Sequence, residues 1–260
     1  MIISDSHRLV FVHIPKCAGT TVRAGLKAID GLDGRFDGCF DRPEGGRVLL
    51  HHLPLADLRS HFRACYDKVE AYDSYAILRA ARPRFASALF QHLRSFQRLD
   101  PSCASPSLFR RKAREICLRL DQAAERRAFD LMFFLPQSDF VAVGGRQIVR
   151  HLYPIEDLPR FAQDLRARHG LAVDVDVRHN EASLPPPPRL AGRQKMAGAV
   201  LRRLLGAGRF ARLRSGLRRL SGLAPDALYR QLFEDDAVAC FIDAYYAEDQ
   251  QRYDALVARA

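Results

Sequence analysis

Residues 9–21 read LVFVHIPKCAGTT, and this stretch decides the fold that we expect for the chain. The run Val10–Val12 is β-branched and aromatic, which is typical of a buried strand. Pro15 has no N–H group to donate and therefore ends the strand, and Gly19 permits a sharp turn after it. The residues that follow predict a helix over Val22–Ile29. The stretch thus predicts a strand, a tight loop and the beginning of a helix.

The predicted loop carries several groups that bind anions. Lys16 supplies an ammonium group, and the hydroxyl of Thr20 or Thr21 is suited to cap the helix. Backbone N–H groups at a helix N-terminus, together with the positive end of the helix dipole, favour a bound phosphate or sulfate. The alternative interpretation is an ordinary strand-to-helix turn with a solvated lysine.

The order of residues in this loop differs from that of a Walker A motif. A Walker A motif places Lys directly after its second Gly, whereas Lys16 stands three residues before Gly19. The order P-K-x-x-G-T-T after a strand instead resembles the 5′-phosphosulfate loop of sulfotransferases, and it is most similar to the glycan-type group called sulfotransferase family 2. The resemblance implies a donor-binding loop made of Pro15, Lys16, Cys17, Ala18, Gly19, Thr20 and Thr21.

A second motif follows a predicted strand over Ser74–Leu78, about sixty residues beyond the first motif. Arg79, Arg84 and Ser87 give the order R-x-x-x-x-R-x-x-S at the start of an amphipathic helix predicted over residues 82–96. This order is similar to R-D-P-x-x-R-x-x-S, the 3′-phosphate site of the same family, with two alanines in place of Asp and Pro. The resemblance assigns these three side chains to the nucleotide, and a solvated basic helix start is the alternative.

Two histidines follow a further predicted strand, Arg47–His51, and precede a helix predicted over Leu55–Phe62. In open parallel sheets the C-terminal ends of the strands face the ligand. Sulfotransferases that resemble this chain place their base, a Glu or a His, after the second strand, so the resemblance implies that His51 or His52 takes the proton from the acceptor. Successive strand residues point to opposite faces, so we expect one ring to face Lys16 and favour His52. For each ring, structural packing or hydrogen bonding is the alternative.

The composition is that of a folded chain without an apolar run of membrane-spanning length. The chain has 260 residues, of which 48% are hydrophobic, enough for one large α/β domain or for one domain with an appendage. The first fifteen residues lack the apolar stretch of a signal peptide, and we expect a cytoplasmic protein. The six cysteines show no C-x-x-C spacing and no His partner at metal-ligand distance, so we expect reduced thiols and no metal site.

The formal net charge of +11 indicates anionic ligands, such as a nucleotide, an acidic polymer or a lipid surface. The chain contains no helix-turn-helix, zinc-finger or RNP-type motif, so nucleic acid is not an expected partner. Much of the charge lies between Arg189 and Arg219, where there are ten Lys or Arg residues and no acid. Residues 189–223 are therefore predicted to contact a membrane surface or a polyanion as basic amphipathic helices, or to pack on the domain as a lid.

Weaker similarities to the same family continue along the chain. Leu135–Gln137 is similar to an L-x-x-Q segment, and Tyr153–Leu158 is similar to Y-R-x-E-D-L without its Arg. Arg178–Asn180 is similar to an H-N-x-S region through His179 and Asn180, and Tyr245–Tyr253 contains a terminal Y-x-x-D-x-x-x-Y. Further predicted elements are a strand over Arg146–Tyr153 and helices over Ile155–His169, Pro225–Phe233 and Asp236–Val257.

These features predict an α/β fold with a P-loop-like parallel sheet, helices on both faces and a basic helical insertion near the C-terminus. The expected divisions are an α/β core over 1–184, a Pro-rich stop with the basic insertion over 185–224, and C-terminal helices over 225–260 that pack on the core.

The resemblance implies a sulfotransferase that moves a sulfuryl group from 3′-phosphoadenosine 5′-phosphosulfate (PAPS) to a hydroxyl of a glycan or similar acceptor, without a metal. In this scheme Lys16 neutralises the leaving phosphate, and Arg79 and Ser87 hold the 3′-phosphate. The alternative is a catalytically degenerate nucleotide-fold module that docks on a membrane or a polyanion. A nucleotide kinase fits less well, because the chain lacks a Walker A motif and an evident Mg²⁺-binding acid at a strand end.

Overall fold

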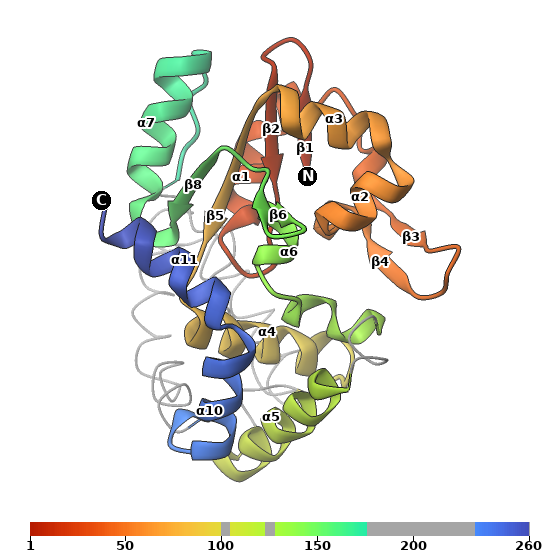
Figure 1. Ribbon diagram of the computed structural model, residues 1–260, viewed down its shortest axis with the longest axis vertical. Helices are drawn as coiled ribbons and strands as arrows, with labels where there is room; N and C mark the ends of the chain where they lie inside the picture. The colour runs from red at the N-terminus through yellow and green to blue at the C-terminus, as the bar shows by residue number, and fades with distance from the viewer. Residues whose placement is uncertain (100–104, 123–127, 176–231, 260) are drawn as a thin grey trace, which may run out of the picture.

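The fold is built on a four-stranded sheet with the strand order β1–β2–β5–β8 (Figure 1). The computed structural model describes residues 1–99, 105–122, 128–175 and 232–259. The strands of this sheet are β1 (Ile2–Ser4), β2 (Leu9–Val12), β5 (Asp73–Leu78) and β8 (His151–Pro154). β2, β5 and β8 run parallel, whereas β1 pairs antiparallel with β2 at one edge. The predicted α/β class is confirmed, and the sheet is mixed instead of purely parallel.

Helices and two short hairpins surround this sheet. The helices are α1 (Gly19–Leu26), α2 (Leu55–His61), α3 (Arg63–Ala71), α4 (Ala81–Ser95), α5 (Pro106–Asp121), α6 (Ser138–Val141), α7 (Leu158–His169), α10 (Asp236–Tyr245) and α11 (Ala247–Val257). The hairpins are formed by β3 (Cys39–Asp41) with β4 (Arg47–Leu49), and by β6 (Ala142–Val143) with β7 (Arg146–Gln147). Turns of 3₁₀ helix cover Lys27–Ile29, Arg35–Asp37, Leu50–His52, Phe129–Phe134 and Ile155–Asp157.

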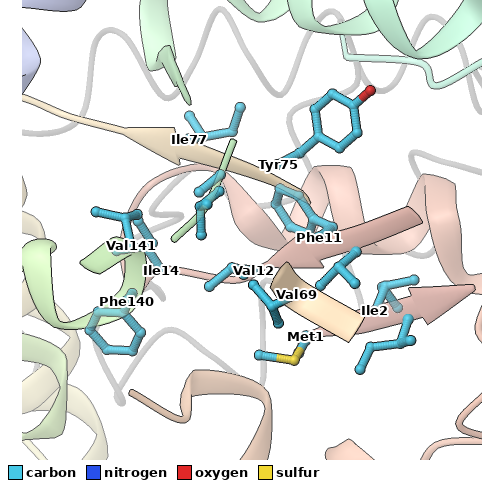
Figure 2. Packing of buried hydrophobic residues seen from close by; sticks show 14 of the residues in the cluster. Met1, Ile2, Phe11, Val12, Ile14, Val69, Tyr75, Ile77, Phe140 and Val141 are labelled. Atoms are coloured by element: carbon cyan, nitrogen blue, oxygen red, sulfur yellow. The ribbon is translucent and has the colours of Figure 1, made fainter. Parts of the chain in front are cut away.

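The two central strands are buried on both faces. Each residue of β2 is at most 1% exposed, and Ser74–Leu78 of β5 are buried as well. Because side chains alternate along a strand, this burial requires cover on both sides of the sheet. Phe161 of α7 covers part of it, with ring-centroid distances of 6.1 Å to Phe11 and to Tyr75. Figure 2 shows residues of this cluster, to which Val69 of α3 also belongs.

A second apolar core lies among α4, α5 and α10, which pack together below the sheet in Figure 1. Phe85, Leu89 and Leu93 of α4 are fully buried, which confirms the apolar face predicted for this helix. The helix predicted over Asp236–Val257 is divided into α10 and α11 at Tyr246. α10 packs on α4 and α5, whereas α11 packs on β8, so the break lets the C-terminal segment contact both cores.

The strand predicted over Arg47–His51 is not part of the central sheet. β4 pairs antiparallel with β3 in a separate hairpin. The reason is the turn between them, where Gly45 and Gly46 have φ angles of 97° and 87°, a left-handed conformation that glycine adopts without steric cost. His51 and His52 therefore lie in a 3₁₀ turn after a hairpin, and not at the C-terminal end of a sheet strand.

A second glycine pair changes another prediction. Gly144 and Gly145 have φ angles of 58° and 78° and form the turn between β6 and β7, so the strand predicted from Arg146 is interrupted and β8 begins only at His151. The predictions for Arg178–Asn180, the Pro-rich stop, the segment 189–223 and most of Pro225–Phe233 fall outside the described residues. Of the helices described above, none is long and apolar enough to cross a membrane.

Candidate functional site

The loop from Pro15 to Ala18 joins β2 to α1 in a strained conformation. Lys16 and Ala18 have φ angles of 66° and 57°, in the left-handed region that residues other than glycine seldom occupy. Each such residue costs on the order of 1–3 kcal/mol, and strain of this kind gathers at binding and catalytic sites. Packing against neighbouring elements must therefore hold the loop in this shape.

Gly19, the first residue of α1, lies directly against the ring of His13. A Cβ atom at position 19 would stand 1.9 Å from His13 Cδ2, closer than real Cβ contacts come. Gly19 is not among the residues with a positive φ, so close packing requires the glycine, and not the sharp turn that the sequence predicts. This contact fixes the beginning of α1 against the residue that follows β2.

The N-terminus of α1 has no side-chain cap. Its N-cap residue is Ala18, and its first turn contains no acid. The helix begins earlier than the predicted Val22 and includes Thr20 and Thr21, so neither threonine is the predicted cap. Backbone N–H groups at such an end, together with the helix dipole, provide a site for an anion.

Three cationic side chains influence one another beside this loop. Lys16 Nζ donates to Gln91 Oε1 at 3.5 Å, at the limit of hydrogen-bond distance. The pKa of Lys16 is lowered to about 8, mainly by burial and then by the guanidiniums of Arg79 and Arg94. Within the described part of the chain, no carboxylate is among the charged groups that act on Lys16. A bound anion would therefore relieve the repulsion between these cations.

Arg79 stands where β5 ends, beside the end of β2. Its Nη1 donates to the Lys16 carbonyl at 3.4 Å, so its side chain reaches across to the loop. Gln137 holds its backbone, because the Arg79 N–H donates to Oε1 at 2.9 Å and the Arg79 carbonyl accepts from Nε2 at 2.8 Å. Since β2 and β5 are parallel neighbours, the two predicted phosphate motifs lie side by side at the C-terminal ends of these strands.

One face of α4 carries polar side chains. Ser87 and Gln91 are four residues apart and so share this face, and both are half-buried. Gln91 contacts Lys16 and also donates to Ser95 Oγ at 2.7 Å. The sequence motif extends only to Ser87 and therefore misses Gln91 and Arg94. The polar stripe opposite the apolar face of α4 is the signal that points to them.

Arg84, the third predicted nucleotide ligand of this motif, is instead a core residue. Its side chain is fully buried and donates to the carbonyl of Phe133 at 3.3 Å and to that of Leu135 at 2.9 Å. Its guanidinium lies 4.9 Å from the ring centroid of Tyr246, and its Nη2 lies 3.8 Å from Asp249 Oδ2. Position 84 faces the interior, where the protein itself supplies the acceptors, so the prediction for Arg84 is corrected.

His52 lies in the 3₁₀ turn beside the residue that follows β2. Its Nδ1 is 2.9 Å from the carbonyl oxygen of His13. A carbonyl only accepts, so Nδ1 carries the hydrogen and Nε2 keeps the lone pair that a general base needs. The ring centroid of His52 lies 4.3 Å from those of both His13 and His51. The strand that would point His51 and His52 to opposite faces does not extend through them, because a turn carries both residues.

The environment keeps these imidazoles neutral. The pKa of His52 lies well below its usual 6.5 because the ring is buried, and the nearby His51 and Lys16 lower it as well. The pKa of His51 is lowered to about 4, first by burial and then by nearby cationic groups. Lys16 is among the cationic groups that lower the pKa of His52, and it is not among those that lower the pKa of His51.

A cavity of about 350 Å³ lies along the outer edge of the sheet. Residues of β8, α7 and α11 and of the segments next to them line it. They include four arginines, Arg150, Arg160, Arg168 and Arg259, and two carboxylates, Asp157 and Asp164. None of the described lining residues belongs to the loop, to α1 or to α4. The cavity is therefore separate from the candidate phosphate site.

Three side chains of types that bind metals cluster near the β3–β4 hairpin. They are Glu44, Asp57 and His61, whose ligand atoms lie within 4.8 Å of one another. Arg42 donates to Asp57 Oδ2 from Nε at 3.0 Å and from Nη2 at 2.7 Å. This guanidinium already neutralises the carboxylate, so we assign no metal to the cluster.

Comparisons of the chain with protein-family models, with curated proteins and with solved structures give no match. A strained loop, a helix N-terminus without a side-chain cap and three cations meet at the ends of two parallel strands. All of these features favour a phosphate or sulfate ligand.

Proposed function

We propose that the chain is a sulfotransferase with a P-loop-like core, which uses PAPS as its donor and a hydroxyl of a glycan or similar compound as its acceptor. The observation that carries the proposal is the pairing of two phosphate motifs on neighbouring parallel strands, joined by the contact of Arg79 Nη1 with the Lys16 carbonyl. The donor likewise carries two anionic groups, on the 5′ and 3′ positions of one ribose. Two adjacent cationic groups match that arrangement.

The residues present fit such a donor. The N–H groups of Cys17–Thr21 would bind the 5′-phosphate, with the Lys16 ammonium beside the leaving oxygen. Arg79 offers a planar fork of donors, and Ser87 adds a hydroxyl, so these two would hold the 3′-phosphate. The charged groups that lower the pKa of Lys16 are guanidiniums, so an incoming anion is attracted by these cations together with Lys16.

In the proposed reaction a bond forms between the acceptor oxygen and sulfur, and the bond between sulfur and the 5′-phosphate oxygen breaks. The electron pair of the broken bond stays on the phosphate, where the Lys16 ammonium stabilises it. The acceptor proton goes to Nε2 of His52, whose Nδ1–H is bound to the His13 carbonyl. Positioning and charge stabilisation supply most of the rate, as in phosphoryl transfer.

Calorimetry with adenosine 3′,5′-bisphosphate, which is the product of the donor, and with AMP tests the proposal. We expect the bisphosphate to bind at least about tenfold more tightly, because a hydrogen bond to a charged group contributes roughly 1.5–3 kcal/mol. Transfer of labelled sulfate from PAPS to a panel of glycans then measures turnover. Equal affinities for the two nucleotides together with no transfer would overturn the proposal.

The second candidate is a nucleotide-fold module without turnover that docks on a membrane or a polyanion. Two observations favour it, namely the low pKa of His51 and His52, which makes both rings weak bases, and the arginine-lined cavity outside the nucleotide site. It predicts binding of the bisphosphate with no sulfate transfer, and retention on heparin or anionic vesicles. Retention that survives deletion of residues 189–223 would exclude that segment as the docking surface.

A further inference from the structure

Gln137 lies buried between the two phosphate motifs and contacts both. Its Oε1 accepts from the Cys17 S–H at 3.2 Å and from the Arg79 N–H at 2.9 Å. Its Nε2 donates to the Arg79 carbonyl at 2.8 Å. The exposed fraction of the side chain is 0%, so solvent does not compete for these contacts.

A carboxamide of this length suits the set of contacts. The Arg79 backbone presents one donor and one acceptor, which the amide matches with its oxygen and its nitrogen, as a second peptide group would. A carboxylate would place an oxygen against the Arg79 carbonyl, and asparagine is shorter by one methylene. On the loop side, burial raises the pKa of the Cys17 thiol to about 12, so the thiol keeps its hydrogen and remains a donor.

The segment that carries Gln137 is fixed to the C-terminal helix α11. The N–H groups of Gln137 and Ser138 donate to the two carboxylate oxygens of Asp249, at 2.7 Å and 2.8 Å. Asp249 is 1% exposed, and the Arg84 guanidinium that lies near it also binds the Leu135 carbonyl. The amide of Gln137 therefore has a rigid support from which it holds the loop and the end of β5 together.

We infer that Gln137 is a positioning residue that sets the separation between the 5′-phosphate loop and the 3′-phosphate arginine. This inference rests on the proposed function. One ribose joins the two anionic groups of the donor, so the protein must present its binding groups at a matching separation. Gln137 thereby determines the preference for a 3′,5′-bisphosphate over a nucleotide that has only the 5′-phosphate.

Calorimetry on the full chain measures this preference as the ratio of the dissociation constants of AMP and adenosine 3′,5′-bisphosphate. In Gln137→Leu and Gln137→Glu the ratio is expected to fall by about tenfold, because a displacement of about 1 Å at a positioned group can cost up to two orders of magnitude. Gln163→Leu, at an exposed position of α7, is the matched control and should keep the wild-type ratio.

A purely structural role for Gln137 would lower the melting temperature without changing the ratio, and that result overturns the inference. If the Gln137 variants do not fold, Cys17→Ala and Cys17→Ser test the loop side of the same contact. Serine keeps a donor for Oε1 and alanine does not, so the ratio should fall only in Cys17→Ala, and equal ratios in the two variants overturn the inference. A wild-type ratio near one instead contradicts the proposed function itself, so the two failures are distinguishable.

Discussion

Two sides of the loop handle charge in opposite ways. The cationic side consists of Lys16, Arg79 and Arg94, and the imidazole side consists of His13, His51 and His52. On the cationic side, like charges act on one another without a carboxylate among the groups that shift Lys16 in the described chain. On the imidazole side, burial keeps the rings neutral. The loop belongs to both sides, because Lys16 acts on His52 and Gly19 packs on His13.

The difference indicates which part of a reaction each side suits. Binding of an anion stabilises the cationic side, whereas the imidazole side resists the addition of a charge. In the proposed transfer, the phosphosulfate therefore belongs on the cationic side and the acceptor hydroxyl on the imidazole side. A neutral imidazole with a free Nε2 lone pair is the form that accepts a proton.

The largest expected effect is the loss of turnover in His52→Asn. The amide nitrogen of Asn is placed to keep the hydrogen bond to the His13 carbonyl, while the Nε2 lone pair is lost. Steady-state kinetics should show turnover reduced by roughly 10²–10⁴-fold, the usual contribution of a general base, with little change in bisphosphate affinity. His61→Asn, at a ring on α2, is the control. Wild-type turnover in His52→Asn would mean that the base lies elsewhere.

The pH profile sharpens the same prediction. The active form of His52 is neutral, so turnover should rise with pH through the pKa of His52, and burial places that rise below pH 6.5. This acid limb should be absent from the residual activity of His52→Asn. If the acid limb persists unchanged in His52→Asn, a group other than His52 causes it.

Lys16→Ala tests the cationic side and is expected to lower turnover by about 10²–10³-fold. Bisphosphate binding should weaken much less, because the ammonium acts mainly on charge that develops as the bond breaks. Since the pKa of Lys16 is about 8, turnover should also fall as the pH rises through 8, and Lys16→Arg should remove that fall. Lys27→Ala, at an exposed position, is the control. Equal losses in turnover and in bisphosphate affinity would show that Lys16 contributes to binding only.

Gly19→Ala tests the contact that joins the two sides. The added methyl group would stand 1.9 Å from His13 Cδ2, so the ring or the helix must move. Overpacking of this kind typically costs about 1–3 kcal/mol of unfolding free energy, which urea denaturation measures. Gly38→Ala is the matched control, because a Cβ there has no neighbour within 4 Å. If both variants unfold with the same free energy, the contact between α1 and His13 does not hold the loop.

Sequence patterns predict where Lys16 and Arg79 lie because the determinants of their placement are local, whereas Arg94 lies outside both motifs. The apolar runs of β2 and β5 identify both strands, and the predicted strand boundaries agree with the structure within one residue. Lys16 and Arg79 follow these strands at short, fixed distances along the chain. Their proximity then results from the parallel pairing of the two strands.

The placement of the three histidines on the imidazole side depends on contacts between distant segments, and a local sequence pattern does not predict such contacts. The run Arg47–His51 has the composition of a sheet strand, yet the turn at Gly45 and Gly46 pairs it with β3. Arg84 shows a related limit, because a motif records spacing but not which face of α4 is buried. Gln137 lies in a segment with a weak family similarity, but the role that we infer for it depends on Arg79, 58 positions away in the chain.

The smallest expected effect is the dependence of stability on pH that the imidazole side imposes. Burial lowers the pKa of His51 to about 4 and places those of His13 and His52 well below 6.5. In the unfolded chain each ring titrates near ~6.5, so below that pH the unfolded state binds more protons than the folded state. The contribution of these rings to the free energy of unfolding is therefore fully present above about pH 6.5. It is lost as the pH falls toward about 4.

Thermal unfolding at about pH 7 and about pH 5 measures this loss, because these values lie on either side of the reference His pKa. His51→Leu is expected to reduce the difference between the two melting temperatures by about 2–4 °C, a modest amount because solvent screens this half-buried ring. His7→Leu, between β1 and β2, removes an imidazole outside the cluster and should leave the difference unchanged. Lys16 titrates above this pH range, so a reduction seen only in His51→Leu assigns the acid sensitivity to the imidazole side. If His51→Leu instead keeps the wild-type difference between the two melting temperatures, His51 does not contribute to the loss of stability in acid. The low pKa values of His13 and His52 alone would then distinguish the imidazole side from the cationic side.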